Sequence, residues 1–334
     1  MNPQGVKVVT IGGGTGSFTL LQALKNYVNH LTAVVNMADD GGSTGVLRDE
    51  LGALPPGDVR QCLVALADES SIVRELFNYR FGGDGQSLSG HSFGNLFLTA
   101  LEKVEGDFDK AVETASRILS IRGEVVPVTT DDVTLIYTRR DGSTLEGEWQ
   151  IAEADLQQDG ELPNLTLSPE ASLTGRAESA LKDADIIMIA PGNLYGSLAP
   201  ALLTGGMKTA LQNSPAMKVY VSNLVTKPGQ TTGMGVADHA AEIERFIGAP
   251  VLDYVLFNAK KPSEDLLNRY AKEGEFALDY DVGELAGMHY TAVGDSFVSS
   301  EIHHQDPHDK KIQRTLIRHD ADKVARQLMR LYFS

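Results

Sequence analysis

Five glycine-rich segments of this sequence also carry polar side chains that could bind a phosphorylated compound. They read GGGTGS (12–17), NMADDGGSTG (36–45), SGHSFGN (89–95), APGNLYGS (190–197) and SNLVTKPGQTTG (222–233). Ordinary turns would scatter Gly and Asn without repeatedly adding Ser, Thr, Asp and His. In open α/β sheets, ligands bind beyond the carboxyl ends of the strands. We therefore expect several of these segments to line one crevice, with unrelated turns as the alternative.

The residues that we expect to contact a ligand lie in these segments or close to them. They are Gly12, Gly13, Gly14, Thr15, Gly16, Asn36, Asp39, Asp40, Ser43, Asp58, His91, Asn95, Gly192, Asn193, Ser197, Asn223 and Thr226. Asp58 lies in PPGDVRQ, where a role as helix N-cap would alone explain it. His91 could donate to a phosphate or a sugar, or be structural. Ser92 is a candidate N-cap of the helix that follows.

The first segment joins a buried strand to a helix. Residues 6–11 are mostly apolar, and apolar residues recur at helical spacing over 17–29. Free N–H groups and the helix dipole make such a junction an anion site. The loop fits neither standard nucleotide motif, because Ser17 replaces the last Rossmann glycine and no lysine follows Gly16. A tight turn without a ligand is the alternative.

Asp39 and Asp40 are the strongest acidic candidates. Adjacent carboxylates in a glycine loop could hold Mg²⁺ beside a phosphate or accept hydrogen bonds from ribose hydroxyls, whereas closing a turn is the alternative. We expect one to face the crevice and the other to cap the turn. The second strand ends in Asn36, not in the carboxylate that would bind the ribose of NAD. No cofactor is established, and Mg²⁺ at this pair is the candidate.

No activated nucleophile is evident in the sequence. H-E-x-x-H and C-x-x-C motifs are absent, and we assign no G-x-S-x-G nucleophile elbow, although GGSTG (41–45) and GHSFG (90–94) match its letters. Cys62 shares a helical face with apolar residues, which predicts a buried, unreactive thiol. His303 and His304 suggest a metal, but their polar segment favours a solvated loop. Any chemistry would depend on positioning and charge stabilisation, as in phosphoryl transfer.

The composition and net charge of the chain limit the classes of partner that we expect it to bind. The chain has 334 residues and a net charge of −16. This charge argues against nucleic acid and anionic membranes, which require basic surface. The sequence shows neither a signal peptide nor an apolar span of membrane length. We expect a cytoplasmic protein that forms a homo-oligomer and binds a small phosphorylated molecule.

The elements that would position these residues alternate between strand and helix. The apolar runs at 6–11, 31–37, 184–190, 218–224 and 251–258 predict central parallel strands. Helices are predicted at 17–29, 58–68, 72–80, 92–104, 108–121, 233–247, 263–272 and 320–332. The alternating pattern around Asp141-Gly142 predicts a β-hairpin. We expect one α/β domain over 1–334, a doubly wound, mostly parallel sheet with a β-rich insertion at about 125–170.

Several segments together resemble a known family. They are VVTIGGGTGS, VVNMADDGGSTGVLRDELGALPPGDVRQCL, GHSFGNLFLTALEKV, DDVTL, APGNLYGS, NLVTKPGQT and IRHDADKVA. In this order and spacing the chain resembles the YvcK-like gluconeogenesis (morphogenesis) factors, in the family that includes 2-phospho-L-lactate transferase, CofD. The resemblance extends from residue 6 to about 330 and implies a Rossmann-like CofD fold.

The resemblance also implies a function. The YvcK branch implies binding of UDP-sugars such as UDP-N-acetylglucosamine, and a role in cell shape and wall synthesis during gluconeogenic growth, with no established reaction. It places sugar-nucleotide contacts at Tyr270 and Arg318, which could otherwise be a core residue and a surface charge. The CofD branch implies a transferase that forms a phosphodiester on a deazaflavin (Fo) with Mg²⁺. An NAD-dependent oxidoreductase is disfavoured by Ser17 and Asn36.

Two segments depart from the family pattern. The family usually has P-G-S-L-Y-T-S where this chain has Asn193 and Gly196, which leaves fewer hydroxyl groups for a phosphate. It usually has P-G-E-T-D-G-Y where this chain has Gln230 and Thr232 in place of two carboxylates. These differences affect the expected metal and sugar contacts.

Overall fold

A seven-stranded parallel sheet forms the centre of the protein. The computed structural model describes residues 3–67, 72–82, 88–158, 160–299 and 317–334. The strand order is β10-β9-β8-β7-β1-β2-β3, and every neighbouring pair is parallel. The strands are β1 (Lys7–Gly12), β2 (His30–Val35), β3 (Glu124–Pro127), β7 (Ile186–Ile189), β8 (Met217–Val221), β9 (Tyr254–Asn258) and β10 (Thr291–Asp295). The predicted doubly wound α/β fold is confirmed.

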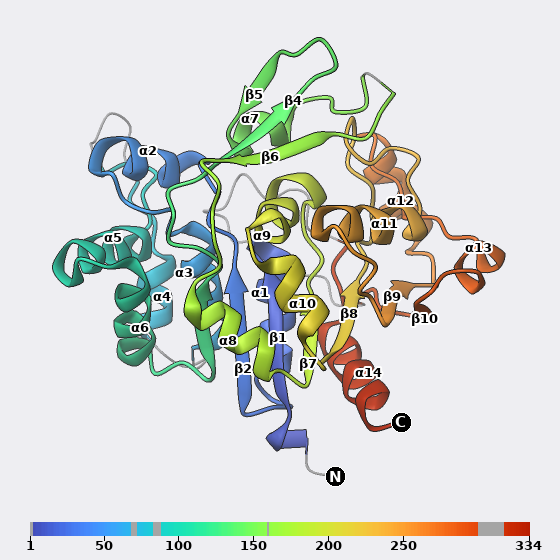
Figure 1. Ribbon diagram of the computed structural model, residues 1–334, viewed down its shortest axis with the longest axis horizontal. Helices are drawn as coiled ribbons and strands as arrows, with labels where there is room; N and C mark the ends of the chain where they lie inside the picture. The colour runs from blue at the N-terminus through green and yellow to red at the C-terminus, as the bar shows by residue number, and fades with distance from the viewer. Residues whose placement is uncertain (1–2, 68–71, 83–87, 159, 300–316) are drawn as a thin grey trace.

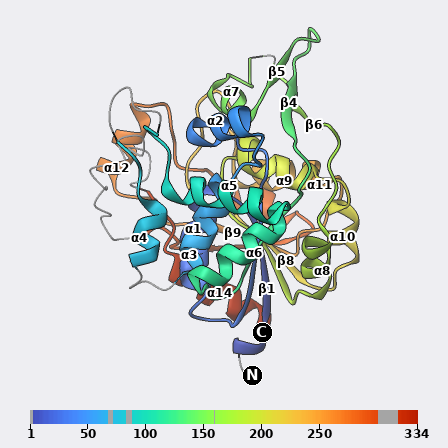
Figure 2. The same ribbon diagram turned by 90° about the vertical axis from the view of Figure 1, so that its left-hand side faces the viewer.

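Helices cover both faces of this sheet (Figures 1 and 2). One face carries α1 (Gly14–Leu24), α3 (Gly57–Leu66), α6 (Phe108–Leu119) and α14 (Ala321–Phe333). The other carries α8 (Gly175–Asp183), α9 (Ala199–Leu203), α10 (Met207–Asn213) and α11 (Val236–Ile247). The remaining helical segments are η1 (Pro3–Gly5), α2 (Gly42–Leu51), α4 (Ile72–Asn78), α5 (Phe93–Glu105), η2 (Leu194–Leu198), α12 (Glu264–Ala271) and α13 (Val282–Ala286).

Burial on both faces explains why the central strands are continuous apolar runs. All four residues of β7 are buried, and full burial of an Ile side chain contributes roughly 1.5–3 kcal/mol. Cys62 on α3 is free and buried, as predicted. Among the described residues, none of the helices combines the length and the apolar character needed to cross a lipid bilayer.

A small antiparallel sheet lies above the carboxyl ends of the main strands (Figure 1). Its order is β5-β4-β6, with β4 (Thr134–Thr138), β5 (Thr144–Glu146) and β6 (Asn164–Ser168). Helix α7 (Glu148–Glu153) lies between β5 and β6 in the chain. Gly142 has a φ of +83°, as the predicted hairpin turn requires. The antiparallel part starts later than residue 125, because Glu124–Pro127 pairs with β2 in the main sheet.

Candidate functional site

The first and fourth glycine-rich segments meet where the strand order reverses, between β1 and β7. The Ala190 amide donates to Ile11 O at 3.0 Å. A Cβ added to Gly16 would lie 1.8 Å from Pro191 O, so only glycine permits this approach. The switch point of an open α/β sheet is where ligands are expected.

The glycine loop binds a carboxylate of the protein itself. Helix α1 begins at Gly14, and the amide of Gly14 donates to Asp58 Oδ1 at 3.0 Å. A Cβ on Gly13 would lie 1.9 Å from Asp58 Oδ2. The interpretation of Asp58 as an N-cap is wrong, because Pro56 is the N-cap of α3 and Asp58 lies in its first turn. Asp58 therefore supplies the negative charge that the N-terminus of α1 favours.

Asp39, Asp58 and Glu148 form an acidic cluster beside this loop. Asp39 Oδ1 accepts from the Gly41 amide at 3.0 Å, and its carboxyl is hydrogen-bonded to Glu148. Glu148 begins α7 of the insertion and accepts from Ser197 Oγ at 3.4 Å. The cluster thus joins three parts of the chain that are distant in sequence.

Burial raises the pKa of each carboxyl in the acidic cluster, and repulsion from neighbouring carboxylates adds to it. Burial is the largest cause of the raised pKa of Asp39. Burial and then the charge of Asp39 raise the pKa of Asp58 to about 7. The pKa of Glu148 lies well above its usual range, through burial and the charges of Asp39 and Asp58. A hydrogen bond between two carboxyl groups requires a proton, so Asp39 and Glu148 share one.

Asp40 has a different role from Asp39. Its Oδ1 accepts from the Trp149 amide at 2.8 Å, and so binds the N-terminus of α7. The two adjacent carboxylates therefore have different hydrogen-bond partners, although the charges of both raise the pKa of Glu148. Within the described ranges, no three His, Cys, Asp or Glu side chains are arranged to hold a metal ion. Mg²⁺ binding by Asp39 and Asp40 stays a prediction from the sequence.

A polar network connects the second and third glycine-rich segments. Ser43 Oγ and His91 Nδ1 are 2.8 Å apart, and Asn95 Nδ2 donates to Ser43 Oγ at 3.4 Å. Asn95 Oδ1 accepts from the buried Arg60 at 2.9 Å. Ser92 caps α5, as predicted, by accepting from the Asn95 amide. Three of the predicted residues therefore lie together, held by a buried guanidinium.

The amides of Asn193 and Asn223 shape the fourth and fifth segments. Asn193 Oδ1 accepts from the amides of Tyr195 and Gly196, each at 3.2 Å. Asn223 forms two hydrogen bonds with the backbone of Gly192, at 3.3 Å from its amide and 2.8 Å to its carbonyl. These bonds hold the loop after β7 against the loop after β8.

Asn36 and Thr15 are positioned by local contacts. Asn36 Oδ1 accepts from the Ala38 amide at 3.1 Å, which shapes the turn after β2. The Thr15 carbonyl accepts from Thr19 Oγ1 within α1 at 2.9 Å, and the Thr15 side chain is exposed. Gly12 has a φ of +147°, a backbone conformation that favours glycine.

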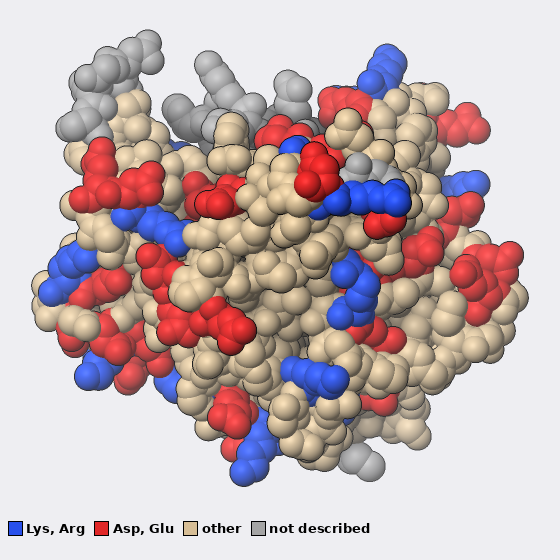
Figure 3. Space-filling model, turned by 45° about the horizontal axis from the view of Figure 1, so that its top comes forward, with Lys and Arg blue, Asp and Glu red and all other residues tan. Residues whose placement is uncertain are grey.

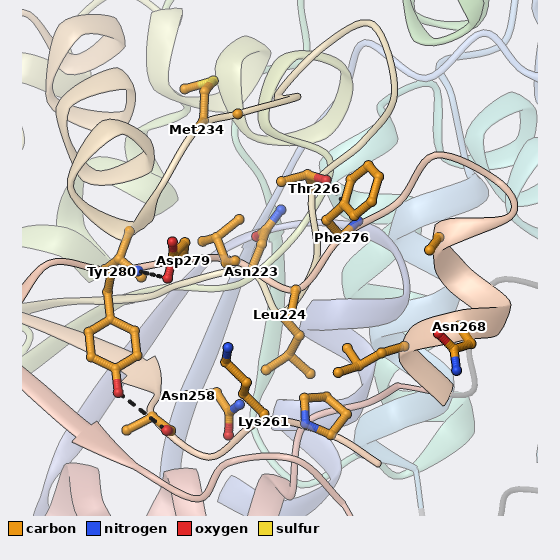
Figure 4. Close-up of a pocket in the computed structure, with 18 residues that line it drawn as sticks. Asn223, Leu224, Thr226, Met234, Asn258, Lys261, Asn268, Phe276, Asp279 and Tyr280 are labelled. Carbon is orange, nitrogen blue, oxygen red and sulfur yellow. Dashed lines mark hydrogen bonds between the residues drawn. The ribbon is translucent and has the colours of Figure 1, made fainter. Parts of the chain in front are cut away.

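A cavity of about 540 Å³ opens at the carboxyl ends of β8 and β9 (Figure 4). Its polar wall includes Asn223, Thr226, Asn258, Lys261 and Asp279. Its apolar wall includes Leu224, Met234, Leu267, Phe276 and Tyr280. Figure 4 shows these groups arranged around a common space, and the phenol of Tyr280 donates to Ala259 O at 3.3 Å. We refer to this cavity as the β8–β9 pocket.

Neither Tyr270 nor Arg318 is among the described residues that line this pocket. Tyr270 is buried with Leu224 and Ile317, and its hydroxyl accepts from the Ile317 amide at 3.0 Å. His319 Nε2 donates to Ser222 O at 3.1 Å, at the end of β8. Arg318 stands between Ile317 and His319, and burial lowers its pKa. The two residues named by the resemblance are thus brought close to the β8 end.

Sequence reasoning missed several residues of this region. Glu148 and Trp149 stood in an expected strand, and Lys261, Phe276 and Asp279 lay outside every glycine-rich segment. Contacts between residues far apart in the sequence leave no local pattern; Asp40 and Trp149, for example, are 109 positions apart. His303 and His304 lie outside the described residues.

Figure 3 shows acidic side chains spread over the face around the insertion, with Lys and Arg scattered among them.

Comparison with known proteins agrees with this architecture. The family described as 2-phospho-L-lactate transferase CofD matches residues 8–298, most of the chain. The chain belongs to the CofD family. The Bacillus subtilis protein named gluconeogenesis factor is 36% identical over 97% of this chain and 98% of its own length. A Nostoc relative is 42% identical over 98% of this chain and 69% of its own.

A solved structure has the same fold. The crystal structure of a member of the UPF0052 family from Bacillus halodurans superposes with a TM-score of 0.86. It is 34% identical in sequence and covers 97% of this chain and 99% of its own.

Proposed function

We propose that this protein is a gluconeogenesis factor that binds a UDP-sugar, UDP-N-acetylglucosamine or a close analogue, in the β8–β9 pocket. The pocket itself carries the proposal. Asn223 and Asn258 are each hydrogen-bonded to backbone, and the second N–H and remaining lone pairs of their amides suit the hydroxyls of a sugar or ribose. The ammonium of Lys261 suits a phosphate. Phe276 is half exposed at the wall and offers an aromatic face to a base.

The same proposal extends to physiology. Relatives over nearly the whole chain are named gluconeogenesis factors. Binding of a wall precursor would let the protein act as a regulator of cell shape and wall synthesis during gluconeogenic growth, without turnover of its own. The buried thiol of Cys62 has a strongly raised pKa because of its burial, which disfavours a thiolate nucleophile at this position.

Isothermal titration calorimetry with a panel of ligands tests this function. UDP-N-acetylglucosamine, GDP, NAD and the deazaflavin Fo are titrated into the wild-type protein with and without Mg²⁺. We expect the UDP-sugar to bind most tightly and NAD weakly. Preferred binding of Fo would replace the proposal with a CofD-type transferase. Preferred binding of NAD would favour an oxidoreductase.

A further inference from the structure

The insertion is hydrogen-bonded to the segment that borders the β8–β9 pocket. Gln230 Nε2 donates to Ile151 O at 2.9 Å and to Ala152 O at 3.0 Å. Lys227 Nζ donates to the same Ala152 carbonyl at 2.5 Å. These carbonyls lie at the C-terminal end of α7, where a cation is favoured by the helix dipole. Residues 227–232 therefore contact the insertion at the last turn of α7.

A second set of bonds joins the same two segments. The Gln157 side chain donates to Thr232 O at 2.9 Å and accepts from the Thr232 amide at 3.0 Å. The Leu156 amide donates to Gly229 O at 2.6 Å. Gly229 has a φ of +67°, and a Cβ there would lie 3.2 Å from Asp155 Cα, so glycine permits this contact.

Residues 227–232 are flanked by two residues of the pocket wall, Thr226 and Gly233. The Thr226 amide donates to Phe276 O at 2.7 Å, and the Phe276 amide donates to Thr226 Oγ1 at 3.0 Å. Phe276 also lines the pocket. A displacement of residues 227–232 would therefore move two adjoining walls.

We propose that Gln230 is a positioning residue for the ligand pocket: by fixing α7 on residues 227–232, it makes the insertion determine the shape of the β8–β9 pocket. The effect on UDP-sugar affinity rests on the proposed function. In this chain the contact depends on an amide, because Gln230 is 1% exposed and both of its acceptors are carbonyl oxygens, so it is a contact that the usual Glu of the family cannot form when ionised. A carboxylate of the same shape has no N–H to donate and would be buried beside two carbonyl dipoles.

Gln230→Glu tests the proposal, with Gln212→Glu as the control. Gln212 is exposed on α10, so the control makes the same charge change away from the insertion. We expect hydrogen exchange in Gln230→Glu to accelerate about tenfold at the amides of Leu156, Gln157 and Phe276. The Kd for UDP-N-acetylglucosamine should rise by a similar factor.

Exchange rates equal to the control at all three amides would overturn the proposal. Faster exchange at Leu156 and Gln157 with an unchanged Phe276 amide would also overturn it, since the insertion would then not affect the pocket wall. If Gln230→Glu fails to fold, Gln157→Ala provides a second test. It removes the two exposed hydrogen bonds between the Gln157 side chain and Thr232, and we expect a smaller acceleration of exchange at the same amides. If wild type does not bind UDP-N-acetylglucosamine, the proposed function fails while the exchange measurements still decide this proposal.

Discussion

The switch point between β1 and β7 and the β8–β9 pocket use their polar groups in different ways. At the switch point, the amide of Gly14 is bonded to Asp58, and Asp39 is bonded to Glu148. At the pocket, Lys261 and Asp279 line an open space of about 540 Å³. The carboxylates of the motif-rich region are therefore bound by the protein's own groups, whereas Ser17 Oγ and Asn36 Nδ2 are buried there without a hydrogen-bond partner among the described residues. Glycine motifs mark close packing as well as ligand approach.

The largest effect should come from filling the contact at the switch point. Gly16→Ala places a Cβ 1.8 Å from the Pro191 carbonyl, which neither backbone can relieve easily. We expect the free energy of unfolding to fall by about 3 kcal/mol or more, measured by urea denaturation. Gly175→Ala, with nothing within 4 Å of the added Cβ, is the control. Equal stability of the two variants would show that the contact between the segments is loose.

The next effect concerns pH. The pKa of Asp58 is about 7 in the folded protein and ~4 in an unfolded chain, so the folded state binds more protons between these values. The free energy of unfolding should therefore fall as the pH rises through this window. Asp58→Asn should reduce this loss by on the order of 2 kcal/mol, because the amide cannot ionise.

Denaturation at pH 4.5 and pH 8 measures this difference, with Asp183→Asn on α8 as an exposed control. A variant with the same pH dependence as wild type would mean that Asp58 does not titrate in this range, and would remove the charge repulsion inferred for the acidic cluster.

Arg318 tests whether the binding site extends from the β8–β9 pocket to the end of β8, because it does not line the pocket itself. A charge-assisted hydrogen bond to phosphate contributes roughly 1.5–3 kcal/mol, about tenfold to a hundredfold in affinity. Arg318→Ala should weaken UDP-N-acetylglucosamine binding by about this factor, measured by calorimetry, with the fold intact by circular dichroism. Arg318→Lys should recover little of the loss, because Lys does not copy a bidentate contact. Unchanged affinity in Arg318→Ala would remove it from the site.

The smallest effect is expected from substitutions that compare the two adjacent aspartates, Asp39 and Asp40. Asp40→Asn keeps an oxygen that can accept from the Trp149 amide, so we expect a change in UDP-sugar affinity of about twofold or less. Asp39→Asn alters the proton shared with Glu148 and should also change the pH dependence of stability. Titration of each variant with ligand and Mg²⁺ checks this. An equal, large dependence on Mg²⁺ in both would indicate a metal site at this pair.

The strands and the overall topology could be predicted because their signal is local. Buried parallel strands such as Ile186–Ile189 are continuous apolar runs. Helix α2 was not predicted, because Gly42 and Gly45 lower helix propensity and resemble a loop. It forms because tertiary contacts supply what propensity lacks, such as the ion pair of Arg48 with Asp132 and the hydrogen bond from Arg48 to Thr134.

The site was predictable only in part. Ser43, His91 and Asn95 do meet, as polar residues at neighbouring loops can. Asp58 looked like a cap because its position before an apolar helical stretch is also the position of caps. Its true partner, Gly14, is 44 residues away, and no sequence pattern encodes that contact. Lys261 is likewise one exposed lysine among several until the fold places it at a cavity.

Calorimetric titration of UDP-N-acetylglucosamine into Lys261→Ala and Lys260→Ala tests the central claim most directly. Lys261 lines the β8–β9 pocket, whereas its neighbour Lys260 is exposed outside the lining. Both variants lose one positive charge, so only the local contact differs. The proposed function predicts an affinity about tenfold lower for Lys261→Ala and close to wild type for Lys260→Ala. Equal affinities in both variants and wild type would contradict binding of the UDP-sugar in this pocket.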